Sequence, residues 1–198
     1  MQGRILAKAE ELSRTLGFRA ITMDELATNL GISKKTIYQY YSDKNSLVDS
    51  VVSTIIQGTQ AKCHNTTLKS ENAIDEIFIT MKNIRKDFQN LNPIVLHDLE
   101  KYFPETYEKF QEHKNNFIYE LIYQNLVNGI AEGYYRNEIK PEILARFRIE
   151  SMLMAFNQNI FPAKKFKLAE VTQAILEHFL YGIATPKGLL LIEKYKSK

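Results

Sequence analysis

The sequence predicts an all-α fold, and three observations support this prediction. Apolar residues recur three and four positions apart through almost the whole chain, the spacing that places side chains on one face of a helix. No segment alternates apolar and polar residues in the way that a half-buried strand does. Several segments also begin at residues that cap helices and end at glycine. The 198 residues are 44% hydrophobic and 25% charged, which is ordinary for a globular protein.

The first two predicted helices have clear ends. The first has apolar residues at helical spacing from Ile5 to Leu16 and ends at Gly17. The second begins at the capping box Thr22–Glu25, in which the threonine hydroxyl and the glutamate carboxylate each satisfy a free backbone amide. It stops at Gly31 because glycine adopts the left-handed cap conformation without steric cost. Its apolar face is formed by Met23, Leu26, Ala27 and Leu30.

Two further helices complete the N-terminal segment. Ser33 can cap a third helix, which carries Lys34 through Tyr40. Either Ser42 or Asp43 can cap a fourth helix. The buried side of this fourth helix is formed by Leu47, Val48, Val51, Val52 and Ile55.

The rest of the chain predicts longer helices. Their expected ranges are about 72–90, 93–102, 104–134, 142–160 and 167–183. Three of the five prolines, Pro93, Pro104 and Pro141, fall near predicted starts, where proline is tolerated. Gly182 and Pro186 mark a break before a short tail.

Residues 22–40 fit a helix-turn-helix unit, in which two short helices meet at a steep angle through a short turn. Ala27 is small enough for the next helix to lie against it, and Gly31 turns the chain. The helices are held together by the apolar residues Leu26, Leu30, Ile32 and Ile37. The second helix of such a unit enters the major groove of DNA. We therefore expect a DNA-binding domain over residues 1–49, the simpler alternative being an ordinary helical hairpin.

The exposed face of the third helix has side chains suited to DNA. These are Lys34, Lys35, Thr36, Tyr38, Gln39 and Tyr40. Lysine neutralises phosphate or reaches guanine, glutamine pairs with adenine, and tyrosine hydroxyls bind phosphates. A lysine pair by itself also fits a solvated surface. Segment 1–49 holds seven basic and six acidic residues, so the position of the lysines carries the argument, not the total charge.

Residues 9–47 resemble the N-terminal domain of the TetR family of bacterial regulators. The matching elements are Ala9 and Leu12, Gly17-Phe18, Ile21-Thr22-Met23, Leu26-Ala27, Gly31-Ile32-Ser33, Thr36-Ile37-Tyr38, Tyr40-Tyr41, Asp43-Lys44 and Leu47. The sequence departs from the family at Ser13, where phenylalanine usually packs the core, and at Tyr41, where phenylalanine is also common.

The resemblance implies roles for individual residues. Thr22 would bind a phosphate at the start of the second helix, and Lys44 would hold a phosphate at the start of the fourth. Bases would be faced by Lys34, Thr36 and Gln39. The DNA backbone or a base edge would be contacted by Tyr38 and Tyr40. The role of Lys35, base or phosphate, stays open.

For residues 50–198 the resemblance implies a helical ligand-binding and dimerisation domain. A homodimer would form through the helices at about 142–160 and 167–183, although their apolar residues could instead fill the core of a monomer. The apolar residues in question are Phe147, Met152, Leu153, Phe156, Ile160, Val171, Ile175, Phe179 and Ile183. A two-fold dimer fits a palindromic operator on double-stranded DNA.

A small apolar or aromatic ligand would need a pocket with aromatic walls and a few polar groups. Segment 97–135 is rich in aromatic residues. The candidate lining residues are Phe88, His97, Phe117, Glu120, Tyr123, Phe156 and Asn157. Each of these could equally serve ordinary core packing.

Several classes of site are not indicated by the sequence. The only cysteine, Cys63, cannot form an intrachain disulfide, which favours a reduced, cytoplasmic setting. No apolar run reaches the length of a membrane span, so no membrane partner is expected. The four histidines form no metal-binding pattern, and no phosphate loop or nucleophile elbow is present. We expect no catalytic residues, no metal and no cofactor.

Together these features predict a homodimeric, TetR-like transcription regulator. In the expected mechanism, a repressor leaves its operator when a small molecule binds the C-terminal domain. An activator, or a regulator that answers to a partner protein, is the alternative within DNA binding. An enzyme or ligand carrier with a vestigial helix-turn-helix is the alternative outside it, and the presence of Thr22, the turn and Lys44 counts against that reading.

Overall fold

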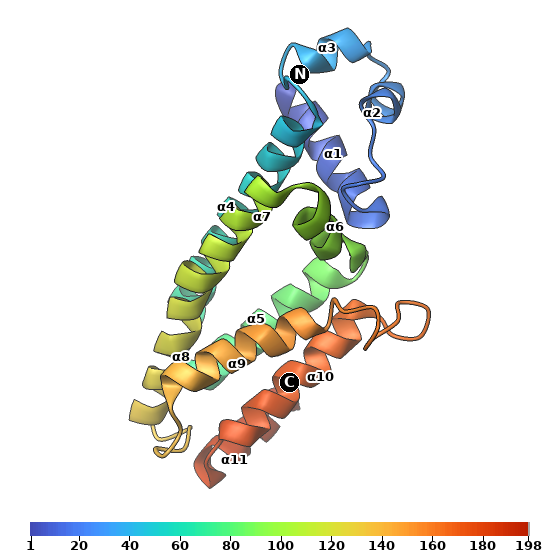
Figure 1. The fold of residues 1–198 in the computed structure, drawn as a ribbon. Helices are drawn as coiled ribbons and strands as arrows, with labels where there is room; N and C mark the ends of the chain where they lie inside the picture. The colour runs from blue at the N-terminus through green and yellow to red at the C-terminus, as the bar shows by residue number, and fades with distance from the viewer. Residues whose placement is uncertain (198) are drawn as a thin grey trace. The chain divides into compact units, whose positions relative to one another are not determined.

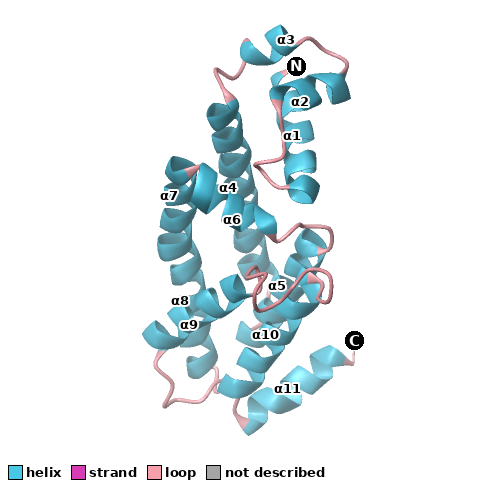
Figure 2. Cartoon of the chain, turned by 45° about the vertical axis from the view of Figure 1, so that its right-hand side comes forward, coloured by secondary structure: helices cyan, strands magenta, loops and turns pink. Residues whose placement is uncertain are grey.

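The computed structural model describes residues 1–197 and confirms the all-α prediction. Within these residues β pairing is limited to a single bridge between Tyr135 and Ala184. Figures 1 and 2 show the helices in sequence order. They are α1 (Gln2–Leu16), α2 (Met23–Leu30), α3 (Lys34–Tyr38), α4 (Lys44–Lys69), α5 (Ala73–Phe88), α6 (Ile94–Tyr102), α7 (Pro104–His113), the π-helical η1 (Lys114–Ile118), α8 (Tyr119–Ala131), α9 (Pro141–Met154), α10 (Leu168–Ile183) and α11 (Pro186–Lys196).

The chain divides into two compact units. The first unit consists of residues 1–59 and 90–112, and the second of residues 60–89 and those from His113 onward. The first unit therefore contains α1 to α3 together with the later helix α6. No helix among residues 1–197 has both the length and the apolar character needed to cross a membrane.

The core of the first unit is built around three fully buried side chains, Ile5, Leu26 and Ile37, from α1, α2 and α3. The rings of Phe18 and Phe103 meet edge to face, with 6.4 Å between centroids. The remaining buried members of this core are Ala9, Met23, Ala27, Tyr41, Leu47, Val48, Val51, Val52 and Leu99. This packing fixes α3 by its apolar side and leaves its other side free.

Both departures from the family pattern lie inside this core. Ser13 is 1% exposed, and its hydroxyl donates to the carbonyl of Glu10 at 2.8 Å. Tyr41 is 3% exposed, and its hydroxyl has no hydrogen-bond partner among residues 1–197. Burial raises the pKa of Tyr41, while the side chain of Gln2 opposes this shift.

The helix ends of the first unit follow the predicted local signals. The Thr22 hydroxyl accepts a hydrogen bond from the Glu25 N–H at 3.0 Å, and the Ser33 hydroxyl accepts one from the Thr36 N–H at 3.1 Å. The second half of the capping box, from the Glu25 carboxylate back to Thr22, does not form among residues 1–197. Gly31 has a φ of 65°, as a left-handed cap requires. Asp43, not Ser42, caps α4 by accepting from the Ser46 N–H at 2.7 Å.

The second unit has its own core, formed mainly where α5, α8, α9 and α10 pack together. Tyr135 lies directly over Gly129, because a Cβ atom at that glycine would come within 2.1 Å of the tyrosine ring. The Tyr135 hydroxyl donates to the Ala73 carbonyl at 3.1 Å. The remaining core includes Ile74, Ile77, Leu126, Ala145, Ile149, Leu176, Phe179, Leu180, Ile183 and Ile192.

Several helices differ from the predictions, and the single helix expected over 104–134 is divided into α7, η1 and α8. α3 ends at Tyr38, two residues early. α9 ends at Met154 and not near 160, because the chain turns there through hydrogen bonds between residues three apart, such as Asn157 N–H to Met154 O at 3.0 Å. The tail is a helix, α11, whose first turn is capped by the Thr185 hydroxyl.

Candidate nucleic-acid interface

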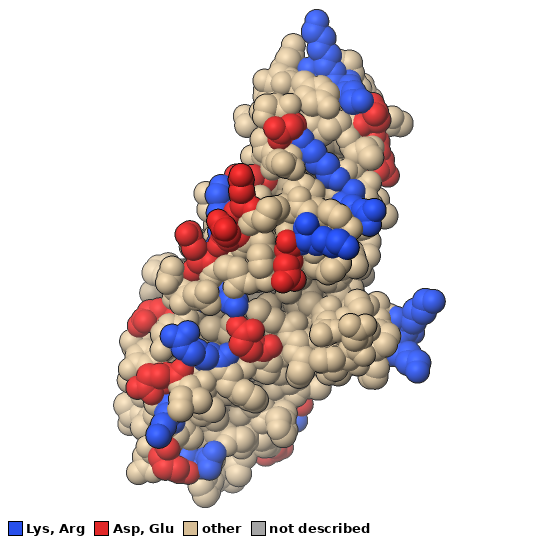
Figure 3. Space-filling model, in the orientation of Figure 1, with Lys and Arg blue, Asp and Glu red and all other residues tan. Residues whose placement is uncertain are grey.

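The outer face of α3 and the turn after it present the predicted side chains to solvent. Lys34, Lys35 and Gln39 are exposed, and Tyr38 and Tyr40 are 46% and 42% exposed. Large aromatic side chains left this open at the end of a small domain are available for a partner. In Figure 3, basic side chains project among uncharged residues at the top of the view, where Figure 1 places α3.

Thr36 differs from its neighbours because it is half-buried. Its hydroxyl lies 2.9 Å from the Ser33 hydroxyl, and its N–H donates to that same oxygen. Thr36 therefore takes part in capping α3 in the free protein.

Lys34 forms an ion pair with Asp24 in the first turn of α2, with 2.8 Å between Nζ and Oδ2. Both side chains are largely exposed. The hydrogen bond to Asp24 raises the pKa of Lys34, so the ammonium stays protonated. A DNA phosphate or base that binds Lys34 must compete with this carboxylate.

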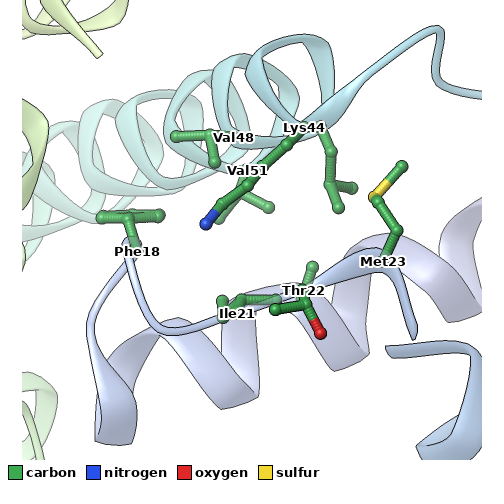
Figure 4. Close-up of a pocket in the computed structure, with 9 residues that line it drawn as sticks. Phe18, Ile21, Thr22, Met23, Lys44, Val48 and Val51 are labelled. Carbon is green, nitrogen blue, oxygen red and sulfur yellow. The ribbon is translucent and has the colours of Figure 1, made fainter. Parts of the chain in front are cut away.

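Thr22, at the start of α2, and Lys44, at the start of α4, line the same small cavity (Figure 4). The Lys44 ammonium is not directed outward: it donates to the Arg19 carbonyl at 2.7 Å and lies 5.6 Å from the centroid of the Phe103 ring. Burial lowers the pKa of Lys44, with Asp98 opposing the shift and Arg19 adding to it. The cavity that Thr22 and Lys44 line is only about 10 Å³, room for about one water molecule and no larger ligand.

An open groove of about 440 Å³ lies on the side of α4 that faces the start of α7. Its lining contains three carboxylates, those of Asp43, Asp49 and Glu105. Lys109 neutralises Asp49 through contacts of 2.7 and 2.8 Å, which leaves the groove with excess negative charge. Phosphate would be repelled there.

Two residues that sequence reasoning missed hold the loop before α2. The buried Asp98 carboxylate accepts from the Arg19 N–H at 2.9 Å, and the Asn92 side-chain amide donates to the Thr15 carbonyl at 3.0 Å. The Arg19 guanidinium also lies 4.8 Å from the centroid of the Tyr102 ring. These contacts join segments about 80 positions apart. Local sequence patterns do not predict such pairs.

The seven residues predicted to line a ligand pocket are not gathered in one place. Phe88 and Phe156 meet edge to face in the second unit, with centroids 5.5 Å apart. Phe117 stacks on His113 and Tyr123 stacks on Tyr119. Three of the seven are exposed: His97, which belongs to the first unit, Glu120 and Asn157. Across residues 1–197, no three histidine, cysteine or acidic side chains are grouped so that they could hold a metal ion.

The fold of the first unit and its exposed α3 face define a helix-turn-helix DNA-binding protein. Residues 5–51 match the family model described as bacterial regulatory proteins, tetR family. Residues 5–51 thus form a helix-turn-helix domain of the kind found in TetR-family transcription regulators.

Relatives extend this similarity over the whole length. An uncharacterized HTH-type transcriptional regulator of Bacillus subtilis, YvaF, is 29% identical over 187 residues, which cover 92% of this chain and 95% of YvaF. A TetR-family regulator from Agrobacterium tumefaciens has a similar structure, with a TM-score of 0.76, 16% identity, and coverage of 93% of this chain and 100% of the other. FadR of Bacillus subtilis, solved with stearoyl-CoA, has a TM-score of 0.70 and is 17% identical. The match covers 92% of this chain and 100% of FadR. At these identities the two structures establish a shared fold.

Proposed function

We propose that the protein is a homodimeric repressor that binds a palindromic operator through α3 of each protomer. A small molecule bound in the second unit would release it. The observation that carries the DNA-binding part is the α3 face, where Tyr38, Gln39 and Tyr40 are exposed while Ile37 is fully buried. A helix held so firmly by one side can place the opposite side in the major groove. The matched family and the structural neighbours are regulators, so we infer a binding protein and not an enzyme.

Dimerisation is supported by an apolar stripe on α9. Ile143, Phe147 and Met154 are 60%, 55% and 40% exposed, and their spacing places them on one face. Exposed apolar patches of this kind mark surfaces that a partner covers. A second copy is the occupant we propose, because two recognition helices related by a two-fold axis match two half-sites of a palindrome.

The dimer contacts that we propose differ from those predicted from sequence. Val171, Phe179 and Ile183 are buried within a single protomer, at 7%, 5% and 3% exposure. They fill the protomer itself, since α10 directs this face inward. Ile143 and Met154 replace them as candidates because they are exposed on α9.

A small-molecule effector is supported by the family and by one relative. FadR of Bacillus subtilis was solved with stearoyl-CoA, which shows that this fold holds a ligand in that protein. In this chain, the Phe88–Phe156 pair is the part of the predicted pocket that the fold brings together. We propose it as one wall of the effector site.

The experiment has a DNA arm. Genomic fragments selected with the purified protein give the operator, and fluorescence anisotropy then measures its affinity. We expect Tyr38→Ala and Gln39→Ala each to weaken binding about tenfold or more. Gln57→Ala, on an exposed side chain of α4, serves as the matched control. Unchanged affinity in both α3 variants would reject α3 as the interface.

The remaining arms test assembly and response. Sedimentation equilibrium of the wild type should give a dimer, and Phe147→Glu should give a monomer that keeps its helicity. A monomeric wild type would reject the homodimer. A protein-free metabolite extract should release the operator complex. A footprint upstream of the promoter elements, with no release, would favour the activator alternative.

A further inference from the structure

Arg148 is a charged side chain inside the core of the second unit. It lies on α9 and is 6% exposed, beside the equally inward-facing Ala145 and Ile149. A buried charge costs several kcal/mol unless it is paired and hydrogen-bonded. A buried arginine therefore calls for a compensating anion, either from the protein or from a ligand.

Within the part of the chain that the structure describes, no side chain or backbone group supplies that partner. A guanidinium carries five N–H donors, and among residues 1–197 none of those of Arg148 makes a hydrogen bond or an ion pair. Its guanidinium lies over the ring of Phe179, whose centroid is 5.7 Å from Cζ. A cation over an aromatic ring offsets only part of the lost hydration.

The two polar groups Glu76 and Tyr135, whose charges act on Arg148, already have other hydrogen-bond partners. The Glu76 carboxylate is buried, and it accepts from the Thr67 hydroxyl at 3.0 Å and from the Asn125 amide at 2.9 Å. The Tyr135 hydroxyl donates to the Ala73 carbonyl. Glu76 and Tyr135 thus act on Arg148 only through longer-range electrostatics.

The neighbouring cysteine does not neutralise the guanidinium either. Burial raises the pKa of the Cys63 thiol and Glu76 raises it further, whereas Arg148 opposes the shift. Burial lowers the pKa of Arg148 itself, but an arginine remains charged at any physiological pH. A positive charge that no other side chain among residues 1–197 pairs with therefore lies at the core of the unit, on a residue that is only 6% exposed.

We propose that Arg148 binds the oxyanion group, a carboxylate or a phosphate, of the effector. A guanidinium forms two parallel hydrogen bonds with either group, and a low-dielectric interior strengthens them. Phe179 and the apolar core around it would contact the uncharged body of the ligand. The effector class is thus an organic anion with an apolar body. This inference rests on the ligand response proposed above and names the chemistry of that ligand.

The test uses the full-length protein without DNA and three probes that share one apolar tail. Octanoate, octyl phosphate and uncharged 1-octanol are compared at equal concentration by thermal unfolding. A ligand that binds only the folded state raises Tm in proportion to its affinity. We expect at least one of the two anions to raise Tm more than octanol does. The anion that succeeds identifies the head group, and equal shifts for all three probes would overturn the proposal.

Two substitutions on the same helix assign the effect. Arg148→Met should weaken binding of the successful anion by about tenfold or more while leaving the effect of octanol unchanged. Arg146→Met removes the same charge at an exposed position of α9 and should bind the anion as the wild type does. Arg148→Gln is the second variant if the methionine variant loses its helicity. Full anion binding in a folded Arg148 variant would refute the assignment.

The outcome is separable from that of the proposed function. Operator affinity is measured independently by anisotropy. If the extract releases the operator but neither anion binds, the ligand response is supported and anion binding by Arg148 is rejected. If the anions bind through Arg148 and no operator is found, the site stands and the DNA-binding proposal falls.

Discussion

The Asp98 carboxylate accepts a hydrogen bond from the backbone N–H of Arg19, with 2.9 Å between oxygen and nitrogen. Asp98 lies on α6 and is 4% exposed, whereas Arg19 lies in the loop that leads to Thr22 and α2. The same carboxylate fills the space beside Gly17, where a Cβ atom would come within 2.5 Å of Oδ2. The start of the helix-turn-helix is thus held by a residue 79 positions away.

Replacing Asp98 should loosen this loop. Asp98→Ala leaves the Arg19 N–H without its acceptor, which we expect to cost about 1–3 kcal/mol of unfolding free energy. Operator binding should weaken as well, because the loop positions Thr22. Denaturant unfolding and fluorescence anisotropy measure the two effects. Glu100→Ala, an exposed acid on the same helix, is the control. Stability equal to that of Glu100→Ala would contradict the role given to this hydrogen bond.

Lys44 allows its structural and DNA-binding roles to be separated. Lys44→Met keeps an aliphatic side chain in the core and removes the ammonium group. Burial lowers the pKa of that ammonium group. The fold disfavours the ammonium form, so stability should hold or rise. In the complex, Lys44 could leave the Arg19 carbonyl and bind a phosphate. The slope of log affinity against log salt concentration should then decrease in Lys44→Met by about the amount expected for one phosphate contact.

The matched control for Lys44 is Lys69→Met, an exposed cation at the other end of α4. It should alter neither the unfolding midpoint nor the salt slope. A salt slope in Lys44→Met equal to that of the wild type would show that Lys44 makes no phosphate contact.

Asp24 competes with DNA for Lys34. In Asp24→Asn the ion pair of 2.8 Å is lost, so Lys34 no longer has to exchange one anion for another. We expect operator binding to tighten by about threefold at low salt, with the gain shrinking as salt rises. Anisotropy titrations at several salt concentrations measure this. Glu112→Gln removes an exposed negative charge from α7 and should change the affinity less. Weaker binding in Asp24→Asn would mean that Asp24 orients Lys34 for the complex.

The sequence was most informative where structure depends on near neighbours. Thr22, Gly31, Ser33 and Asp43 act within four residues of themselves, and each forms the cap that its type and position predict. The order of the helices followed from the spacing of apolar residues in the same way.

Features that depend on distant contacts could not be predicted. The inward turn of Lys44 requires the Arg19 carbonyl, 25 positions away, and the role of Asp98 requires the same loop. The short apolar run in α11 became helical because Ile192 is buried in the core of the second unit. Local patterning also could not distinguish Phe179, which faces inward, from Phe147, which faces solvent.

His113 should make stability depend on acid. It is half-buried, stacks on Phe117 at 5.2 Å, and burial lowers its pKa below 6.5. The unfolded chain therefore binds a proton more readily than the folded one, so stability is complete above about pH 6.5 and falls as the pH drops through the lowered pKa. Unfolding midpoints between pH 7.5 and about 5 measure this loss.

The comparison variant His113→Gln should show a flatter profile over the same pH range. His64→Gln replaces an exposed histidine of α4 and should keep the acid sensitivity of the wild type. Parallel profiles for all three proteins would assign the sensitivity to other groups.

The π-helical turn at Lys114–Ile118 affects how the chain tolerates a change in length. A π turn closes its hydrogen bonds one residue later than an α turn and so holds one extra residue. Deleting Asn115 or Asn116, both exposed, would convert this turn into an ordinary α turn and leave α7 and α8 in register with their neighbours. The same deletion within α8 would rotate the rest of that helix by about 100° and misplace its apolar face. Homologous chains that are one residue shorter in this region should therefore be aligned with their gap at the two asparagines.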